Sequence, residues 1–141
     1  MKKKLFLTLT ALVLAAVVAL SQTPASPKHK TIFQLTEPQG ADWNTLFMHV
    51  QNLQDAFKND GGVQIEVIFF AQGINMLRKT NTAYEDRLKK LKDSGVMLGA
   101  CQNVMKIYGI KSEDLFPFAT EVDAAVAELT RRQEAGYAYI H

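Results

Sequence analysis

Hydrophobic residues along the chain recur with the period of a strand in some stretches and with that of a helix in others. Residues 31–36 are rich in β-branched and aromatic side chains, which predicts a strand. Between Trp43 and Phe57 the apolar residues recur at steps of three and four, which predicts an amphipathic helix with Asp42 placed to cap it. Residues 63–70 begin by alternating and end fully apolar, as a strand in a covered sheet does.

The second half of the chain continues the alternation. In helix 124–134 we expect Ala125, Val126 and Leu129 to face inward. The expected elements, in order, are a short helical turn at 74–77, a helix at 83–94 capped by Asn81 or Thr82, a strand at 96–100, a short helix at 104–108, a short strand at 120–122, the helix at 124–134 and an edge strand at 137–140.

Strands and helices therefore alternate along this whole region. Such an order is typical of a mainly parallel sheet, whose right-handed crossover connections place helices on both faces. We expect an α/β fold with three layers, α/β/α, around a roughly five-stranded sheet.

The first residues have a different pattern. Three lysines, Lys2 to Lys4, precede an apolar run at 5–20, and Ala19 and Ser21 offer small residues for cleavage. This arrangement predicts a signal peptide over residues 1–21 and hence an exported, periplasmic or secreted protein. A retained membrane anchor is the alternative, although the run is shorter than the roughly 20 residues that span a bilayer. A polar, proline-containing lead-in at 22–30 would then join the leader to one domain at 31–141.

Charge and length limit the class of protein further. The net charge of +2 comes from 16 Lys and Arg against 14 Asp and Glu. Three of those lysines belong to the expected leader, so the remainder carries 13 − 14 = −1. This balance does not favour a nucleic-acid partner, and a mature chain of about 110–120 residues is enough for one core and too short for two.

The single cysteine, Cys101, is the main candidate for chemistry. Ligands in open α/β sheets bind at the carboxyl ends of strands, and Cys101 follows the expected strand 96–100 where a helix begins. Free backbone N–H groups at such a helix start favour an anion such as a thiolate. The alternative is that Cys101 is a small buried hydrophobe in the core.

Other chemistry has little support in the sequence. No pattern places His29, His49 or His141 beside Cys101 as a base. His49 lies off the apolar stripe of its helix and is expected at the surface. No metal-ligand spacing and no phosphate-binding glycine loop occurs, so we expect no metal and no cofactor.

Several segments, in order, resemble the DsrE/DsrF-like family. The likeness runs from about Thr31 to Ile140. Its pieces are residues 67–77 (VIFFAQGINML), 84–88 (YEDRL), 91–96 (LKDSGV), 100–105 (ACQNVM), 109–110 (GI), 114–115 (DL), 126–129 (VAEL) and 131–140 (RRQEAGYAYI).

The resemblance implies a three-layer α/β fold, homo-oligomers such as trimers or hexamers, and a link to sulfur metabolism. In better understood branches a cysteine in the loop after a central strand carries sulfur as a persulfide, and Cys101 matches that loop. This chain departs from the family in two ways. Many relatives have His-Gly or Asn-Gly where Phe70-Ala71 stands here, and the sulfur-relay members are mostly cytoplasmic.

Two main hypotheses follow. In the first, the protein is a sulfur carrier or sulfurtransferase that holds a persulfide on Cys101, exchanges sulfur with a donor or acceptor thiol protein, and needs no membrane in its mature form. The backbone N–H groups of Asn103 and Val104 would stabilise the anion, and Gly73 and Asn75 would line the site. In the second, it is a non-catalytic oligomeric binding module with Cys101 buried in its core. Binding of a small anion at the same helix start is a third option.

Overall fold

The computed structural model describes residues 26–141. The expected leader lies outside the described residues, and its assignment as a signal peptide stays a prediction. The elements, in chain order, are β1 (His29–Leu35), α2 (Ala41–Phe57), β2 (Val63–Phe69), η1 (Ala71–Leu77), η2 (Thr82–Tyr84), α3 (Glu85–Asp93), β3 (Met97–Cys101), α4 (Gln102–Tyr108), η3 (Ser112–Asp114), β4 (Thr120–Val122), α5 (Ala125–Glu134) and β5 (Ala138–Ile140).

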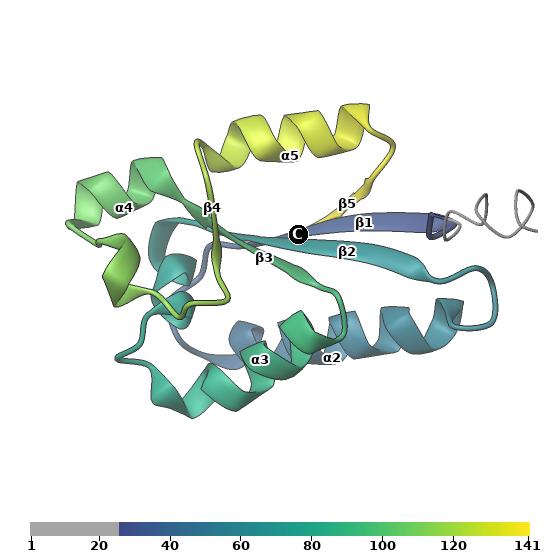
Figure 1. The fold of residues 1–141 in the computed structure, drawn as a ribbon, viewed down its shortest axis with the longest axis horizontal. Helices are drawn as coiled ribbons and strands as arrows, with labels where there is room; N and C mark the ends of the chain where they lie inside the picture. Colours follow the sequence, from purple (N-terminus) through teal and green to yellow (C-terminus); the bar gives the residue numbers. More distant parts are fainter. Residues whose placement is uncertain (1–25) are drawn as a thin grey trace, which may run out of the picture.

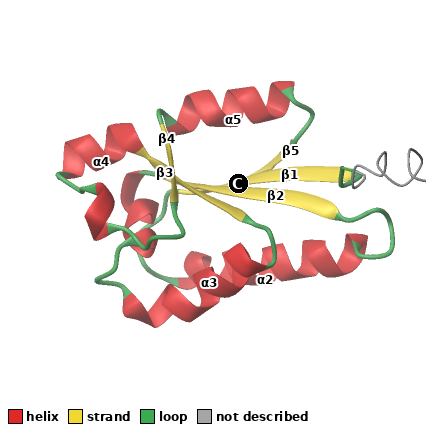
Figure 2. Ribbon diagram, in the orientation of Figure 1, coloured by secondary structure: helices red, strands yellow, loops and turns green. Residues whose placement is uncertain are grey.

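The strands form one parallel sheet in the order β4-β3-β2-β1-β5. The chain therefore adds β2, β3 and β4 in one direction and then returns across the sheet through α5 to place β5 beside β1. Figure 1 shows α2 and α3 on one side of the sheet and α5 on the other, and Figure 2 shows the resulting three layers. The predicted α/β/α fold with a five-stranded parallel sheet is confirmed.

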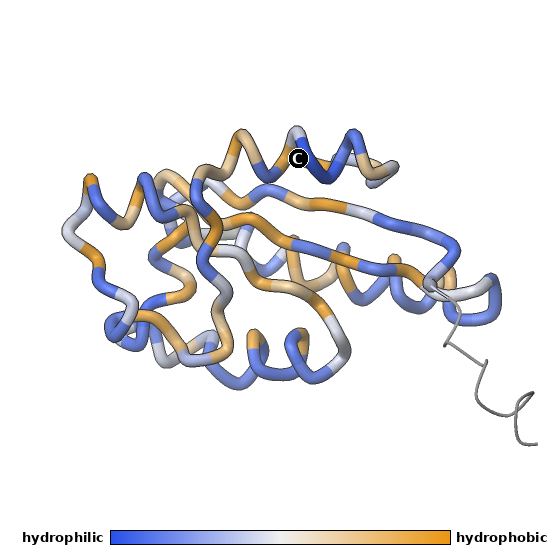
Figure 3. The backbone as a smooth tube through the Cα atoms, turned by 45° about the horizontal axis from the view of Figure 1, so that its top comes forward, coloured by the Kyte–Doolittle hydropathy of each residue, from blue (hydrophilic) through white to orange (hydrophobic). Residues whose placement is uncertain are grey.

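Side chains alternate between the two faces of the sheet and build two cores of unequal size. The larger core lies between the sheet and the helices α2 and α3, and includes Trp43, Phe69 and Leu88. The smaller one lies under α5 and consists of Ile32, Ile68, Cys101, Ala125, Leu129 and Tyr137. In Figure 3 the central strands carry long hydrophobic stretches, while the helices alternate between hydrophobic and hydrophilic positions.

The expected helix starts were wrong in detail. Gly40, not Asp42, is the N-cap of α2, because the helix already begins at Ala41 and Asp42 lies in its first turn. Asn81 is the N-cap of the 3₁₀ turn η2, and Tyr84 is the N-cap of α3, because that turn delays the α-helix. Neither Gly40 nor Tyr84 makes a side-chain cap hydrogen bond.

One expected core residue of α5 is at the surface. Ala125 and Leu129 are one helical turn apart and are buried, whereas Val126 is 67% exposed. A single step along a helix turns the side chain by about 100°. Because α5 reaches the sheet through a narrow stripe only, that turn is enough to point Val126 toward solvent.

Candidate functional site

Cys101 is both the last residue of β3 and the N-cap of α4. Its backbone is extended, and it pairs with Val122 on β4. The side chain points to the face of the sheet that α5 covers, and the residue is 3% exposed. The prediction that this cysteine ends a buried strand is confirmed.

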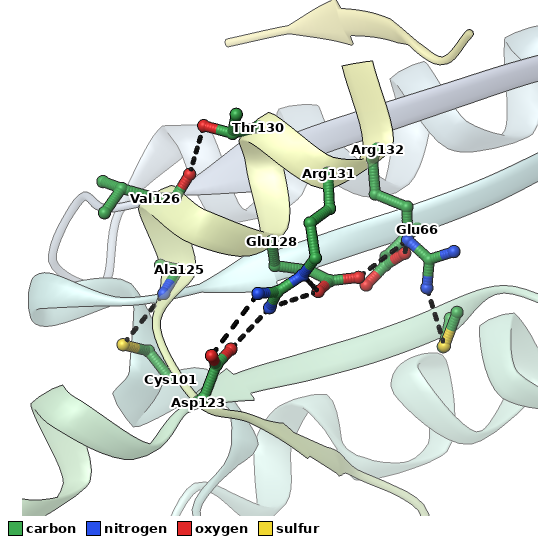
Figure 4. Close-up of polar contacts among 10 residues, drawn as sticks. Glu66, Cys101, Asp123, Ala125, Val126, Glu128, Thr130, Arg131 and Arg132 are labelled. Carbon is green, nitrogen blue, oxygen red and sulfur yellow. Dashed lines mark hydrogen bonds and ion pairs between the residues drawn. The ribbon is translucent and has the colours of Figure 1, made fainter. Parts of the chain in front are cut away.

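The sulfur of Cys101 accepts a hydrogen bond from the start of α5. The donor is the backbone N–H of Ala125, with its nitrogen 3.3 Å from Sγ (Figure 4). The N-cap of this helix, Ala124, has no side chain that could accept a bond from the first turn. The thiol sulfur therefore satisfies one of the four free N–H groups of the first turn, the one at the first helical residue.

The rest of the surroundings of Cys101 are apolar. Ile32, Ile68 and Leu129 belong to the same buried cluster, and the partly buried Val104 and Val122 pack against it. These groups exclude water from the sulfur. A reagent in solution can reach Sγ only if one of the covering segments moves.

A second polar feature lies under the middle of α5. Glu66 on β2 is 1% exposed and forms an ion pair with Arg132. Arg132 Nε also lies 2.8 Å from Glu128 Oε1, so one guanidinium holds two carboxylates. Burial raises the pKa of Glu66 from its ordinary value, and the positive charge of Arg132 offsets part of that rise.

The polar chain continues along α5 toward Cys101. Arg131 Nη2 lies 2.8 Å from Glu128 Oε2 and also pairs with Asp123, just before the helix (Figure 4). The hydrogen bond from Arg131 keeps the pKa of Asp123 below its ordinary range. The network thus ties α5 to the sheet through Glu66 and fixes its first turn through Asp123.

Comparison with known proteins agrees with this architecture. The model of the DsrE/DsrF-like family matches residues 28–141. The chain belongs to the DsrE/DsrF-like family. Its fold also resembles a solved structure, the protein of unknown function MTH1491 from Methanobacterium thermoautotrophicum, with a TM-score of 0.73 and 28% identity over 80% of this chain and 98% of that one. Among curated proteins no match was found.

The structure gives different surroundings to the four residues predicted from the sequence to lie at the site, Cys101, Gly73, Asn75 and Asn103. Gly73 is buried, and its N–H donates to the carbonyl oxygens of Thr36 and Phe70. The amide of Asn75 donates to Gln72, within its own turn. Among the contacts recorded for residues 26–141, neither residue reaches Cys101.

Asn103 is exposed on α4, next to the cysteine in sequence. The hydrogen bond that the structure records at Sγ comes from Ala125 instead, a residue that sequence reasoning had placed only in the core. The sequence carried one signal for it: Asp123-Ala124-Ala125 opens a helix without a side-chain acceptor at Ala124, so its first amide needs an acceptor from another element.

The structure also shows where the histidines lie and whether side chains gather that could bind a metal ion. His49 is exposed, as expected, and His29 stacks on Phe57 and contacts Asp60. His141 lies beside Tyr139. Within residues 26–141 no group of three or more His, Cys, Asp or Glu could hold a metal ion. No helix in that part of the chain is long and apolar enough to cross a bilayer.

Proposed function

We propose that this member of the DsrE/DsrF-like family carries sulfur as a persulfide on Cys101 after export from the cytoplasm. The family is linked to sulfur metabolism. The observation that carries the proposal is the N–H of Ala125 directed at Sγ from the start of α5. A donor at that position stabilises negative charge on sulfur, whether the charge belongs to a thiolate or to a persulfide.

The proposed reaction is a thiol exchange without net oxidation. The thiolate of Cys101 attacks the outer sulfur of a donor persulfide or polysulfide. A bond forms between Sγ and that sulfur, the sulfur–sulfur bond of the donor breaks, and the donor leaves as a thiolate that takes up a proton. An acceptor thiolate later attacks the same outer sulfur, which returns Cys101 to its thiolate.

Access to the sulfur requires motion, because Cys101 is 3% exposed. The first turn of α5 is the segment that both covers the sulfur and donates to it. Only Ala125 and Leu129 of this helix are buried. A helix that buries so little apolar surface opens at lower cost than the larger core. We therefore propose that α5 moves at its start to admit a donor.

Mass spectrometry of the intact protein tests the sulfur-carrier proposal. Incubation with inorganic polysulfide should add the mass of one sulfur atom to the wild type, and dithiothreitol should remove it. Cys101 is the only cysteine, so Cys101→Ser should gain nothing. Equal gains in both proteins, or no gain in the native wild type, would reject the proposal.

The burial of Cys101 favours a second candidate function, a non-catalytic oligomeric binding module in which the cysteine packs the small core. Alkylation of the native protein separates the two. If the protein is a sulfur carrier, Cys101 should be alkylated under native conditions. The rate of alkylation should depend little on urea, because only α5 has to open. A structural cysteine labels only as the whole domain unfolds, with the full urea dependence of unfolding.

We further propose that the protein is a homo-oligomer, on the strength of family resemblance. Light scattering of the purified mature chain measures its mass directly. The binding-module function needs that assembly to persist in Cys101→Ala. A monomer at micromolar concentration would argue against both the assembly and the module.

A further inference from the structure

A groove on the opposite face of the sheet is not used by any function above. It lies between α2 and the sheet edge formed by β1 and β5, and consists of two adjoining hollows of about 240 and 380 Å³. Phe33, His49 and Ile140 line both of them. Phe33 and Ile140 are register partners on β1 and β5, so they form the floor of one continuous groove.

One end of the groove lies at the carboxyl ends of β1 and β5. The chain leaves β1 toward α2 on one face of the sheet, and it reaches β5 from α5 on the other. The first hollow lies beside the residues that end these two strands, Leu35 and Ile140. In open α/β sheets ligands bind in crevices outside the carboxyl ends of the strands.

The two ends of the groove differ in chemistry. The first hollow lies at the carboxyl ends of the strands, and its lining includes the carboxylates of Glu37 and Asp42 and the side chain of Thr36. One oxygen of Glu37 accepts a bond from Thr36, which orients the carboxylate. The described residues that line the two hollows include no Lys or Arg, and the first hollow also has the imidazoles of His49 and His141. The carboxylates therefore make this end negative wherever those imidazoles are neutral.

The second hollow is almost entirely apolar. Along α2 its wall is made by Leu53, Ala56 and Phe57, and Asn52 contributes the one amide. The residues of α2 that line the groove recur at steps of three and four, so they form one stripe on the flank that faces β5. A ligand that fills both hollows needs a charged or polar head and a hydrocarbon body.

We propose that this groove binds an amphiphilic amine. The ammonium head lies against Glu37 and Asp42 at the ends of the strands, and the hydrocarbon body lies along Phe33, Leu53 and Ile140. This site is separate from Cys101, which lies on the other face of the sheet. Binding there is therefore independent of the sulfur chemistry proposed above.

Three probes of equal chain length test the charge selection: hexylammonium, hexanol and hexanoate, titrated into the full-length mature protein at low ionic strength and followed by NMR chemical shifts. Hexylammonium should bind most tightly and hexanoate least. In Glu37→Gln/Asp42→Asn the affinity for hexylammonium should fall at least threefold, toward that of hexanol, whose binding should not change.

The apolar end has its own variant and a matched control. Ala56 is exposed on α2, so Ala56→Trp fills the second hollow without disturbing the core and should weaken hexylammonium and hexanol together by about tenfold. Ala83→Trp, at an exposed site on η2 outside the groove, should leave both unchanged. Circular dichroism confirms that each variant is folded. Equal affinity for hexanoate and hexylammonium, no binding of either, or an unchanged preference in the carboxylate double variant would each overturn the proposal.

Discussion

Ala71 adopts a backbone conformation that residues with a side chain rarely adopt. Its φ is +46°, in the left-handed region, directly after β2. Alanine therefore makes a turn here that glycine would make without steric cost.

We predict that Ala71→Gly stabilises the protein. Release of the left-handed strain contributes about 1–2 kcal/mol, and the greater freedom of glycine in the unfolded chain removes about 0.5–1 kcal/mol of that. Urea unfolding should show the net gain. As a control, Ala135→Gly changes an exposed residue with φ −82° and should lower stability. A loss of stability in both variants would contradict the assignment of strain to Ala71.

Gly73, two residues later, is required for a different reason. A Cβ at this position would lie 2.1 Å from the carbonyl oxygen of Leu35, so the turn after β2 packs directly on the end of β1. We predict that Gly73→Ala destabilises the domain by about 3 kcal/mol, because backbone atoms must separate to admit the methyl group. Gly40→Ala, whose Cβ would meet nothing closer than 3.8 Å, should cost less than about 1 kcal/mol by the same urea assay.

Residue-scale detail was the least accessible to sequence reasoning. The position of Cys101 at the end of β3 followed from an apolar run and a helix start. The donor to its sulfur did not, because Ala125 lies 24 residues further on and only the packing of α5 across the sheet brings it to Sγ. Val126 was misplaced for the same reason: the period of the helix gave several possible inward faces, and the tilt of α5 chose among them.

At the scale of elements, α5 covers one face of the sheet and buries only two of its residues, Ala125 and Leu129. Its buried polar anchor is the pair formed by Arg132 and Glu66. A buried ion pair contributes little when compared with an apolar pair of the same shape, yet the loss of one partner leaves an unpaired charge in the interior.

We predict that Arg132→Met destabilises the domain by about 3 kcal/mol, since Glu66 would lose its cation. The matched variant Arg131→Met removes exposed ion pairs with Asp123 and Glu128 and should cost less than about 1 kcal/mol. Adding Glu66→Leu to Arg132→Met should recover much of the loss. Calorimetry or urea unfolding of the wild type, the two single variants and the double variant measures these differences in the free energy of unfolding. Equal losses from the two arginine variants would refute the anchoring role of Glu66.

The order and type of the elements were predictable, since strands and helices of this length have clear periods. β1, β2 and β4 lie within two residues of the expected bounds. The exact starts of the helices could not be predicted, because Gly40 and Tyr84 make no side-chain cap bonds and so leave no signature in the sequence. The buried Glu66 was also missed: an acid within an alternating run is equally consistent with a solvated strand face.

At the scale of the whole molecule, different ionisable groups change the stability of the folded protein in opposite directions as the pH falls. The raised pKa of Glu66 means that the folded state binds a proton more readily than the unfolded chain does. The contribution of Glu66 to the stability of the folded state is therefore largest at pH values below the ordinary carboxyl pKa. It is lost as the pH rises through the raised pKa. Asp123 and Glu121 have lowered pKa values, so the opposite holds for them. Their contribution to the stability of the folded protein is lost as the pH falls through those lowered values.

We predict that the stability difference between the wild type and Glu66→Gln changes in favour of the wild type as the pH falls from neutral to about 4, since the unperturbed carboxyl pKa lies near 4.3. Thermal unfolding at a series of pH values measures this difference. A difference that is flat with pH would show that the pKa of Glu66 is the same in the folded and unfolded states.

Because α5 and β5 come last in the chain, Cys101 is synthesised before the segments that cover it. A ribosome makes Cys101 before Ala125, Leu129 and Tyr137, which cover it in the finished protein. The sulfur is therefore uncovered while the last part of the chain is still being synthesised, and its surroundings close only when α5 and β5 dock. During that interval an oxidant meets an unshielded thiol, and irreversible oxidation then would leave a charged group where the small core must close.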